Sequence, residues 1–317
     1  MQCPVPLTPK GGLPILYVNL QMPSFKNYLS LVKFSHSIFA MPFALIGFFL
    51  GKEYIDNSSV LLFSYGGFFL STFVLVILCM VFARSAAMAF NRWLDKKFDA
   101  KNPRTAIREI PSGVISANNA LIFTIVSCAL FLVTCFFINR ICFYLSPVAL
   151  FVVLFYSYTK RFTALCHLVL GVGLSLAPIG AYLAVTGQFA LLPVLFSFTV
   201  LFWVSGFDII YALQDEEFDK SNQLHSIPAA LGKSKALQVS NLLHILSATC
   251  VITAGFYGGF GYWYWIGVLV FCGLLIYQHT LVKPNDLRKV NMAFFTTNGI
   301  ASVVFAIFVI LDLFLNQ

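Results

Sequence analysis

The chain has 317 residues, of which 59% are hydrophobic and only 10% are charged. Because soluble domains carry about 25% charged residues, this composition excludes an ordinary soluble protein and indicates an integral membrane protein. The net charge of +8 does not predict nucleic-acid binding, because no surface pattern of alternating basic and aromatic residues accompanies it.

The predicted elements begin after a short N-terminal extension. Residues 1–24 are rich in proline and lack a clean apolar core, so they are interpreted as a flexible N-terminal extension and not as a signal peptide. Residues 25–34 predict an interfacial amphipathic helix. Nine apolar segments long enough to span a membrane follow, near residues 36–52, 62–90, 117–138, 142–159, 164–185, 190–212, 237–257, 261–279 and 291–315. We therefore expect one all-α membrane domain over residues 25–317.

The basic residues predict how these helices are oriented. Of the 20 Lys and Arg residues, Lys52 and Arg140 lie in one set of loops and Arg84 lies inside a helix. The other 17 lie in the N-terminal segment or in the loops near 91–113, 160–162, 214–236 and 280–290. With nine helices these regions share one side of the membrane, which the positive-inside rule assigns to the cytoplasm. The C-terminus is then expected on the opposite side.

Two acidic runs with the same spacing interrupt the apolar sequence. Asn91, Asp95 and Asp99 fall at positions i, i+4 and i+8. The same intervals separate the members of a second trio, Tyr211, Asp215 and Asp219. Each four-residue step turns an α-helix by only about 40° beyond a full turn, so each trio is expected to share one helix face. Eight of the twelve acidic residues lie within 95–109 or 208–219, so the acidic charge is concentrated at these two places.

The two trios predict a site for Mg²⁺ and a diphosphate. Carboxylates aligned beside a membrane are costly unless cations hold them together, and hard oxygen ligands with phosphate favour Mg²⁺. Asn91 offers the metal a neutral oxygen, and Tyr211 offers the phosphate a hydrogen bond. Arg104 and Lys160 are the nearest candidates to bind the diphosphate oxygens, with Arg161 and Lys101 as further ones. Magnesium and cations around a diphosphate indicate heterolysis of its ester bond.

Two charged residues are predicted to lie deeper in the membrane. Arg84 precedes Asn91 by seven residues, and Asp208 precedes Asp215 by the same interval. Charges inside a membrane are candidates for function. Either the two pair with each other, or Arg84 binds a carboxylate on an acceptor molecule while Asp208 orients a hydroxyl group or takes a proton.

Together these motifs resemble the UbiA superfamily of intramembrane prenyltransferases. The family's first signature, N-x-x-x-D-x-x-x-D, is matched by Asn91, Asp95 and Asp99. Its second, D-x-x-Y-x-x-x-D-x-x-x-D, is matched by Asp208, Tyr211, Asp215 and Asp219. Tyr156 and Lys160 match the Tyr-x-x-x-Lys element of the family, and Arg104 also fits its pattern. The resemblance covers the chain from about Lys33 to the C-terminus.

The resemblance implies a nine-helix bundle with a central cavity beneath a cytoplasmic cap. It also implies Mg²⁺-dependent transfer of a polyprenyl group from its diphosphate, with Asn91 and the four motif aspartates as metal ligands. Arg104, Tyr156 and Lys160 would bind the diphosphate. An arginine at position 84 is typical of members whose acceptor is an aromatic acid, 4-hydroxybenzoate above all, in respiratory quinone synthesis. Asp208 and Tyr211 would act at the reaction centre.

Three alternatives remain open at this stage. Parts of the sequence also resemble the branch that prenylates 1,4-dihydroxy-6-naphthoate in menaquinone synthesis, and Arg84 serves either acceptor. Haem, a chlorophyll precursor or a glycerol phosphate as acceptor would not need a buried arginine. A cation-coupled transporter would place its acids at the membrane midplane, whereas here they lie at helix ends. We expect a bacterial cytoplasmic membrane, an active site facing the cytoplasm, and no obligate protein partner.

Overall fold

The computed structural model describes residues 24–32, 39–57 and 65–316. In this part of the chain the structure is helical throughout, with a single isolated bridge between Lys283 and Asp286 as its only β-type pairing. The helices are α1 (Phe25–Leu31), α2 (Met41–Asn57), α3 (Tyr65–Lys101), α4 (Ala117–Ile138), α5 (Arg140–Thr159), α6 (Cys166–Thr186), α7 (Leu191–Ala212), α8 (Glu216–Ser221), α9 (Ile227–Gly258), α10 (Tyr262–Leu281) and α11 (Asn298–Leu315). The π-helical turn Met292–Thr297 leads into α11.

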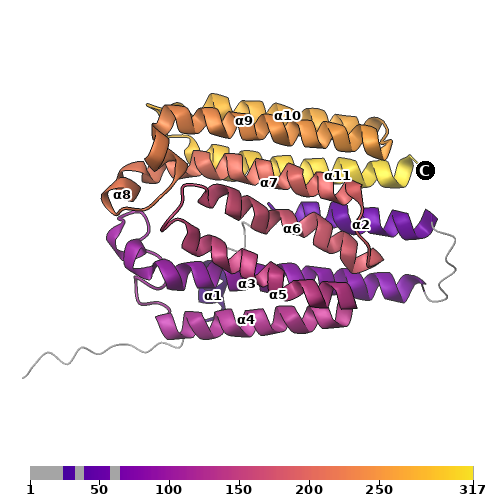
Figure 1. Cartoon of the computed structure of the whole chain (residues 1–317), viewed down its shortest axis with the longest axis horizontal. Coiled ribbons are helices and arrows are strands. Elements are labelled where there is room, and N and C mark those ends of the chain that lie inside the picture. Colours follow the sequence, from indigo (N-terminus) through magenta and orange to yellow (C-terminus); the bar gives the residue numbers. More distant parts are fainter. Residues whose placement is uncertain (1–23, 33–38, 58–64, 317) are drawn as a thin grey trace, which may run out of the picture.

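The predicted all-α membrane fold is confirmed. Eight helical stretches of the described residues are long and apolar enough to cross a membrane. The 17-residue helix α2 lies alongside them in the bundle (Figure 1), so each of the nine predicted spans coincides with a helix. Residues 36–38 and 62–64 of the first two predicted spans, and residues 1–23 of the predicted extension, lie outside the described residues.

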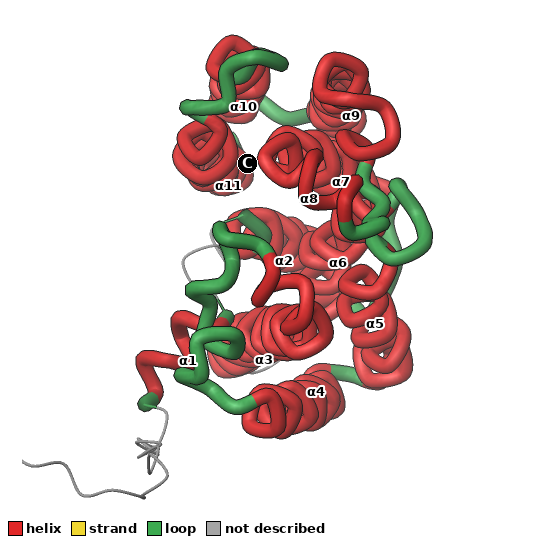
Figure 2. The backbone as a smooth tube through the Cα atoms, turned by 90° about the vertical axis from the view of Figure 1, so that its left-hand side faces the viewer, coloured by secondary structure: helices red, strands yellow, loops and turns green. Residues whose placement is uncertain are grey.

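The helices α2 and α6 lie between two groups of neighbours. Seen along the bundle, α7, α9, α10 and α11 lie on one side of them and α3, α4 and α5 on the other (Figure 2). Helix α6 packs against both α2 and α7, and α3 packs against α4. Two long helices extend past the predicted spans: α3 continues through the first acidic trio to Lys101, and α9 begins at Ile227, ten residues before the predicted start. A positive φ of 78° at Gly232 kinks α9, a conformation that favours glycine.

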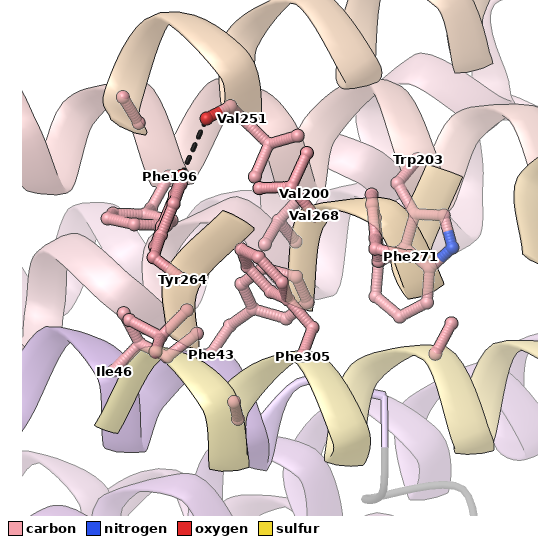
Figure 3. Packing of buried hydrophobic residues seen from close by; sticks show 14 of the residues in the cluster. Phe43, Ile46, Phe196, Val200, Trp203, Val251, Tyr264, Val268, Phe271 and Phe305 are labelled. Atoms are coloured by element: carbon pink, nitrogen blue, oxygen red, sulfur yellow. Dashed lines mark hydrogen bonds between the residues drawn. The ribbon is translucent and has the colours of Figure 1, made fainter. Parts of the chain in front are cut away.

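Aromatic side chains fill the core of the α2, α7, α9, α10 and α11 group. Phe43, Trp203 and Phe305 are among the largest fully buried side chains, and their rings lie within 6 Å of one another in successive pairs (Figure 3). Buried tyrosine and tryptophan need partners for their polar atoms. Tyr264 Oη donates to the Val251 carbonyl at 2.6 Å, and Trp203 Nε1 donates to an Asn298 side chain at 2.8 Å.

The loops that follow the acidic trios lie at the same end of the bundle. Helix α8 and the segments after α3, α5 and α7 lie at the left of Figure 1, whereas the C-terminus lies at the right. The basic loops and the C-terminus therefore lie at opposite ends of the bundle, as the positions of the basic residues predicted. At the opposite end, the buried acid Asp312 has a structural role: it accepts hydrogen bonds from the backbone of Gly261 (2.8 Å) and Tyr264 (3.2 Å) and so caps α10.

Candidate active site

The first acidic trio occupies the last three turns of α3. The Asn91 side-chain amide donates to Asp95 at 3.1 Å, which is the i, i+4 contact that a continuous helix provides. Asp95 also pairs with Arg161 at 3.0 Å. Asp99 is nearly buried and pairs with Arg108 at 2.6 Å. The predicted shared face is therefore present in this motif.

The second trio departs from a continuous α-helix. Helix α7 carries Tyr211 and ends at Ala212, and a 3₁₀ turn, Leu213–Asp215, follows before α8 begins. The expectation of one α-helical face through Tyr211, Asp215 and Asp219 is therefore wrong in detail. A 3₁₀ turn has about three residues per turn, so it changes the direction in which the later side chains point. Asp219 consequently lies on the short helix α8 and is fully buried, with an exposed fraction of 0%.

Basic residues link the two motifs. The Arg104 guanidinium binds Asp215 with Nε at 3.2 Å from Oδ1, and its Nη1 donates to the Tyr211 hydroxyl at 2.8 Å. Asn102 Nδ2 donates to the same carboxylate at 3.2 Å. Since Arg104 follows α3 and Asp215 follows α7, these contacts join the two acidic runs. Burial alone would lower the pKa of Arg104, but Asp215 and Tyr211 raise it above its ordinary value.

Lys160 makes the equivalent link to Asp219. Its Nζ lies 2.8 Å from Asp219 Oδ1, and the hydroxyl of Ser226 donates to Oδ2 of the same carboxylate at 2.8 Å. Burial would lower the pKa of Lys160, yet the Asp219 carboxylate raises it above its ordinary value. Lys160 and Arg104 therefore both stay charged at neutral pH. Each of the four motif aspartates is paired with a different basic residue.

The donor set fits a magnesium ion shared with a phosphate ligand. Among the described residues, no three His, Cys, Asp or Glu side chains converge on one point. Mg²⁺ in phosphate sites is held by one or two carboxylates together with phosphate oxygens and water, so a three-carboxylate cluster is not required. Asp99 Oδ2 is buried and accepts no hydrogen bond from the described residues, which leaves a hard oxygen for a cation. The predicted ligands Asn91, Asp95, Asp99, Asp215 and Asp219 are thus chemically suited to the ion.

A largely apolar cavity of about 420 Å³ lies between α3, α4, α5 and α6. Arg84 and Tyr156 are among the few polar side chains that line it. Arg84 lies on α3 before the first trio, and Tyr156 lies on α5 one turn before Lys160. Such a cavity, with a few placed polar groups, is typical of a small-molecule site. Arg84 is close enough to Tyr156 and Arg92 to interact with both electrostatically.

Asp208 pairs with a histidine that the sequence did not single out. His167 Nδ1 lies 2.7 Å from Asp208 Oδ2. Among the described residues this is the ion pair of Asp208, so the alternative in which Asp208 pairs with Arg84 is not formed. Asp208 also lies near enough to Tyr156 for an electrostatic interaction between them.

Sequence reasoning missed several residues at this site, His167, Asn102, Arg108, Ser226 and the buried Arg92. One signal existed for Arg108, which lies four residues after Arg104 in the loop that closes the first motif. For His167 there was none, since a lone histidine at the start of an apolar segment has many structural uses. Lys101 and Arg161, considered as extra cations, differ: Arg161 binds Asp95, whereas Lys101 is exposed at the end of α3.

Residues 37–300 match the profile of the UbiA prenyltransferase family. The chain belongs to this family. It is 32% identical over 235 residues to the 4-hydroxybenzoate octaprenyltransferase of Nitrosomonas europaea, which covers 74% of this chain and 80% of the relative. It is 30% identical over 223 residues to the enzyme of that name from Tolumonas auensis, covering 70% of this chain and 78% of the relative.

Solved structures show the same fold. A UbiA homolog from Aeropyrum pernix in its apo state superimposes with a TM-score of 0.75 at 28% identity, covering 87% of this chain and 98% of that one. A UbiA homolog from Archaeoglobus fulgidus bound to DMAPP and Mg²⁺ has a TM-score of 0.66 at 20% identity, covering 91% and 99%. The protein is therefore a multi-pass membrane prenyltransferase, as predicted.

Proposed function

We propose that this prenyltransferase moves a polyprenyl group from its diphosphate to the ring of a hydroxylated aromatic acid, with 4-hydroxybenzoate as the first candidate. The observation that carries the proposal is the placement of Arg84 and Tyr156 in a cavity whose other walls are almost wholly apolar. A buried guanidinium suits a carboxylate, and apolar walls suit an isoprenoid. The curated relatives named above, which are 4-hydroxybenzoate octaprenyltransferases, support this choice of acceptor.

The diphosphate is assigned to the end of the bundle where the two motifs meet. Asn91, Asp95, Asp99, Asp215 and Asp219 would hold Mg²⁺, which supplies charge stabilisation for the departing diphosphate. Arg104 and Lys160 carry fixed positive charges beside Asp215 and Asp219 and can turn from these carboxylates to phosphate oxygens. Tyr211, already bonded to Arg104, lies where it can hydrogen-bond the same group. These residues lie at the ends of α3, α5 and α7 and in the segments that follow these helices.

The acceptor is assigned to the groups beside the cavity. Arg84 would bind its carboxylate, and Tyr156 would lie between this arginine and the diphosphate end. During transfer the allylic C–O bond breaks with its electron pair going to the diphosphate, and a ring carbon ortho to the hydroxyl bonds to the allylic carbon. The ring then loses a proton. Asp208 would orient the acceptor hydroxyl or accept its proton, because it is partly exposed, lies near Tyr156 and is not among the carboxylates assigned to Mg²⁺.

The naphthoate acceptor remains the second candidate. 1,4-Dihydroxy-6-naphthoate also carries a carboxylate and ring hydroxyls, so Arg84 and Asp208 would serve it in the same way. A transporter is disfavoured because the motif acids are paired with cations at one end of the bundle and not at its middle. We assign the site to the cytoplasmic face of a bacterial cytoplasmic membrane, in line with the basic loops at that end.

Acceptor-dependent release of diphosphate tests this function. Purified protein is supplied with a polyprenyl diphosphate and Mg²⁺, with and without 4-hydroxybenzoate. The proposal expects release to rise in proportion to a prenylated product and to stop when EDTA is added. Release that is indifferent to every aromatic acid and to EDTA would refute it.

A further inference from the structure

His167 and Asp208 form a short side-chain contact between α6 and α7. His167 is the second residue of α6, and Asp208 lies on α7 one turn before the end of that helix. The backbone amide of Ile227, the first residue of α9, donates to His167 Nε2 at 3.4 Å. If Nε2 accepts this bond, the ring proton lies on Nδ1, and in a doubly protonated ring Nδ1 carries a proton as well. Nδ1 therefore donates to Asp208 Oδ2 at 2.7 Å.

The two side chains differ in how far they are buried, and this difference indicates different roles. The His167 side chain is only 4% exposed, whereas that of Asp208 is 25% exposed. The histidine is thus enclosed by α6, α7 and α9, and the carboxylate is the member of the pair that can reach a substrate. We propose that His167 is a positioning residue for the transfer reaction, which fixes the rotamer of Asp208 so that its carboxylate faces the proton of the acceptor. This inference rests on the proposed function.

The segment that holds the histidine also reaches the diphosphate end of the site. Ser226 bonds to Asp219 at 2.8 Å, and its neighbour Ile227 bonds to His167. The backbone amide of His225, one residue earlier, donates to the Lys160 carbonyl at 2.7 Å. Residues 225–227 therefore contact both the Lys160–Asp219 pair and the His167–Asp208 pair. We expect His167 to keep Asp208 aligned with the place where the diphosphate departs.

Substitutions of His167 can separate the two hydrogen bonds of the ring. An asparagine amide nitrogen superimposes on Nδ1, so His167→Asn keeps the donor to Asp208. A glutamine amide reaches the position of Nε2, so His167→Gln keeps a partner for Ile227 and loses the donor to Asp208. His167→Leu removes both. His225, whose side chain is exposed in the same segment, supplies the control His225→Leu.

The test measures kcat and KM for prenyl transfer to the aromatic acid, together with the folded yield of each variant. We expect His167→Leu and His167→Gln to lower kcat by roughly 10-fold or more while the KM for the polyprenyl diphosphate stays within about two-fold, because general-base catalysis contributes about 10²–10⁴-fold and here loses only its alignment. His167→Asn should recover most of kcat, and His225→Leu should match the wild type.

The same His167 substitution in Asp208→Asn protein distinguishes a positioning role from support of the fold. In Asp208→Asn protein, His167→Leu should cost little further kcat, because residues that act as a unit are non-additive. An equal loss in both backgrounds, or His167→Gln with wild-type kcat, would overturn the inference while leaving the proposed function intact. A wild-type protein that prenylates no aromatic acid would overturn both.

Discussion

Arg104 and Asp215 are separated by 111 residues in sequence, and yet the guanidinium Nε of one lies 3.2 Å from the carboxylate of the other. This contact joins the loop after α3 to the 3₁₀ turn after α7. It brings the two acidic motifs together, because a cation that follows the first motif neutralises a carboxylate of the second. A planar guanidinium achieves this because it can bond Asp215 and the Tyr211 hydroxyl together.

Replacement of Arg104 by lysine should weaken diphosphate binding. Lysine keeps the charge but loses the fork geometry, and hydrogen bonds to charged groups contribute about 1.5–3 kcal/mol each. We expect Arg104→Lys to raise the KM for the polyprenyl diphosphate by about 10-fold or more with little change in the KM for the aromatic acid. Steady-state kinetics with each substrate varied in turn measures this, with the exposed Arg288→Lys as control. Equal effects on both substrates would refute the assignment.

Neutralising a motif aspartate should remove activity without unfolding the protein. Asp95→Asn and Asp215→Asn retain the shape of the side chain but lose the charge that would hold a divalent cation. We expect transfer to fall by about 100-fold or more. Product formation and membrane-extracted folded yield are compared with Asp286→Asn, which lies in a loop and pairs with Arg288. Activity near the wild-type level in either motif variant would exclude them from the metal site.

Much of this architecture was readable from the sequence because it depends on spacing and hydropathy. The nine predicted spans coincide with α2 and the eight long helical stretches. Binding of the diphosphate by Arg104 and Lys160, which here pair with Asp215 and Asp219, stays a prediction. The 3₁₀ turn Leu213–Asp215 was not predictable, because no glycine or proline in the run marks a break in the helix. His167 was missed for a related reason: its role depends on Ile227, 60 residues away, and spacing rules cover only neighbours along one helix.

The roles of the aromatic residues were likewise not predictable from the sequence. The chain has 35 phenylalanines, and composition alone does not say which of them face a substrate. In the structure Phe196 and Phe271 are fully buried in the core with Trp203, whereas the cavity is walled mainly by smaller aliphatic and sulfur-containing side chains, with Phe131 and Phe189 among the few aromatic ones. Three-dimensional packing determines which phenylalanines face the cavity, and hydropathy carries no information about it.

Replacement of Arg84 should act on the aromatic acid. Arg84→Ala removes the charge that would bind the acceptor carboxylate, so the KM for 4-hydroxybenzoate should rise by about 10–100-fold while the KM for the polyprenyl diphosphate changes little. Kinetics with 4-hydroxybenzoate and with its methyl ester provide the measurement. The wild type should have a lower KM for the acid than for the ester, whereas the variant should have similar KM values for both. If Arg84→Ala raised the diphosphate KM instead, the arginine would belong to the diphosphate site.

Filling the cavity should shorten the isoprenoid that the enzyme accepts. Gly180 lines the cavity on α6, and a Cβ atom added there would meet no atom within 4 Å. Gly180→Leu should therefore lower kcat/KM for long polyprenyl diphosphates by about 10-fold relative to short ones. Gly273→Leu on α10 is the matched control, because that glycine is equally open and lies away from the cavity. The ratio of kcat/KM for octaprenyl and geranyl diphosphates reports the effect, and an unchanged ratio in Gly180→Leu would place the isoprenoid elsewhere.

We propose that the joined motifs and the Arg84 cavity together transfer an isoprenoid to an aromatic acid. The most direct measurement identifies, by mass, the lipids formed when membranes containing the protein receive Mg²⁺, a polyprenyl diphosphate and either 4-hydroxybenzoate or 1,4-dihydroxy-6-naphthoate. We predict a prenylated 4-hydroxybenzoate that disappears with EDTA; a prenylated naphthalene product alone would change the acceptor and keep the site. Absence of a prenylated product from both acids, with the polyprenyl diphosphate left intact, would show that the protein does not prenylate these aromatic acids.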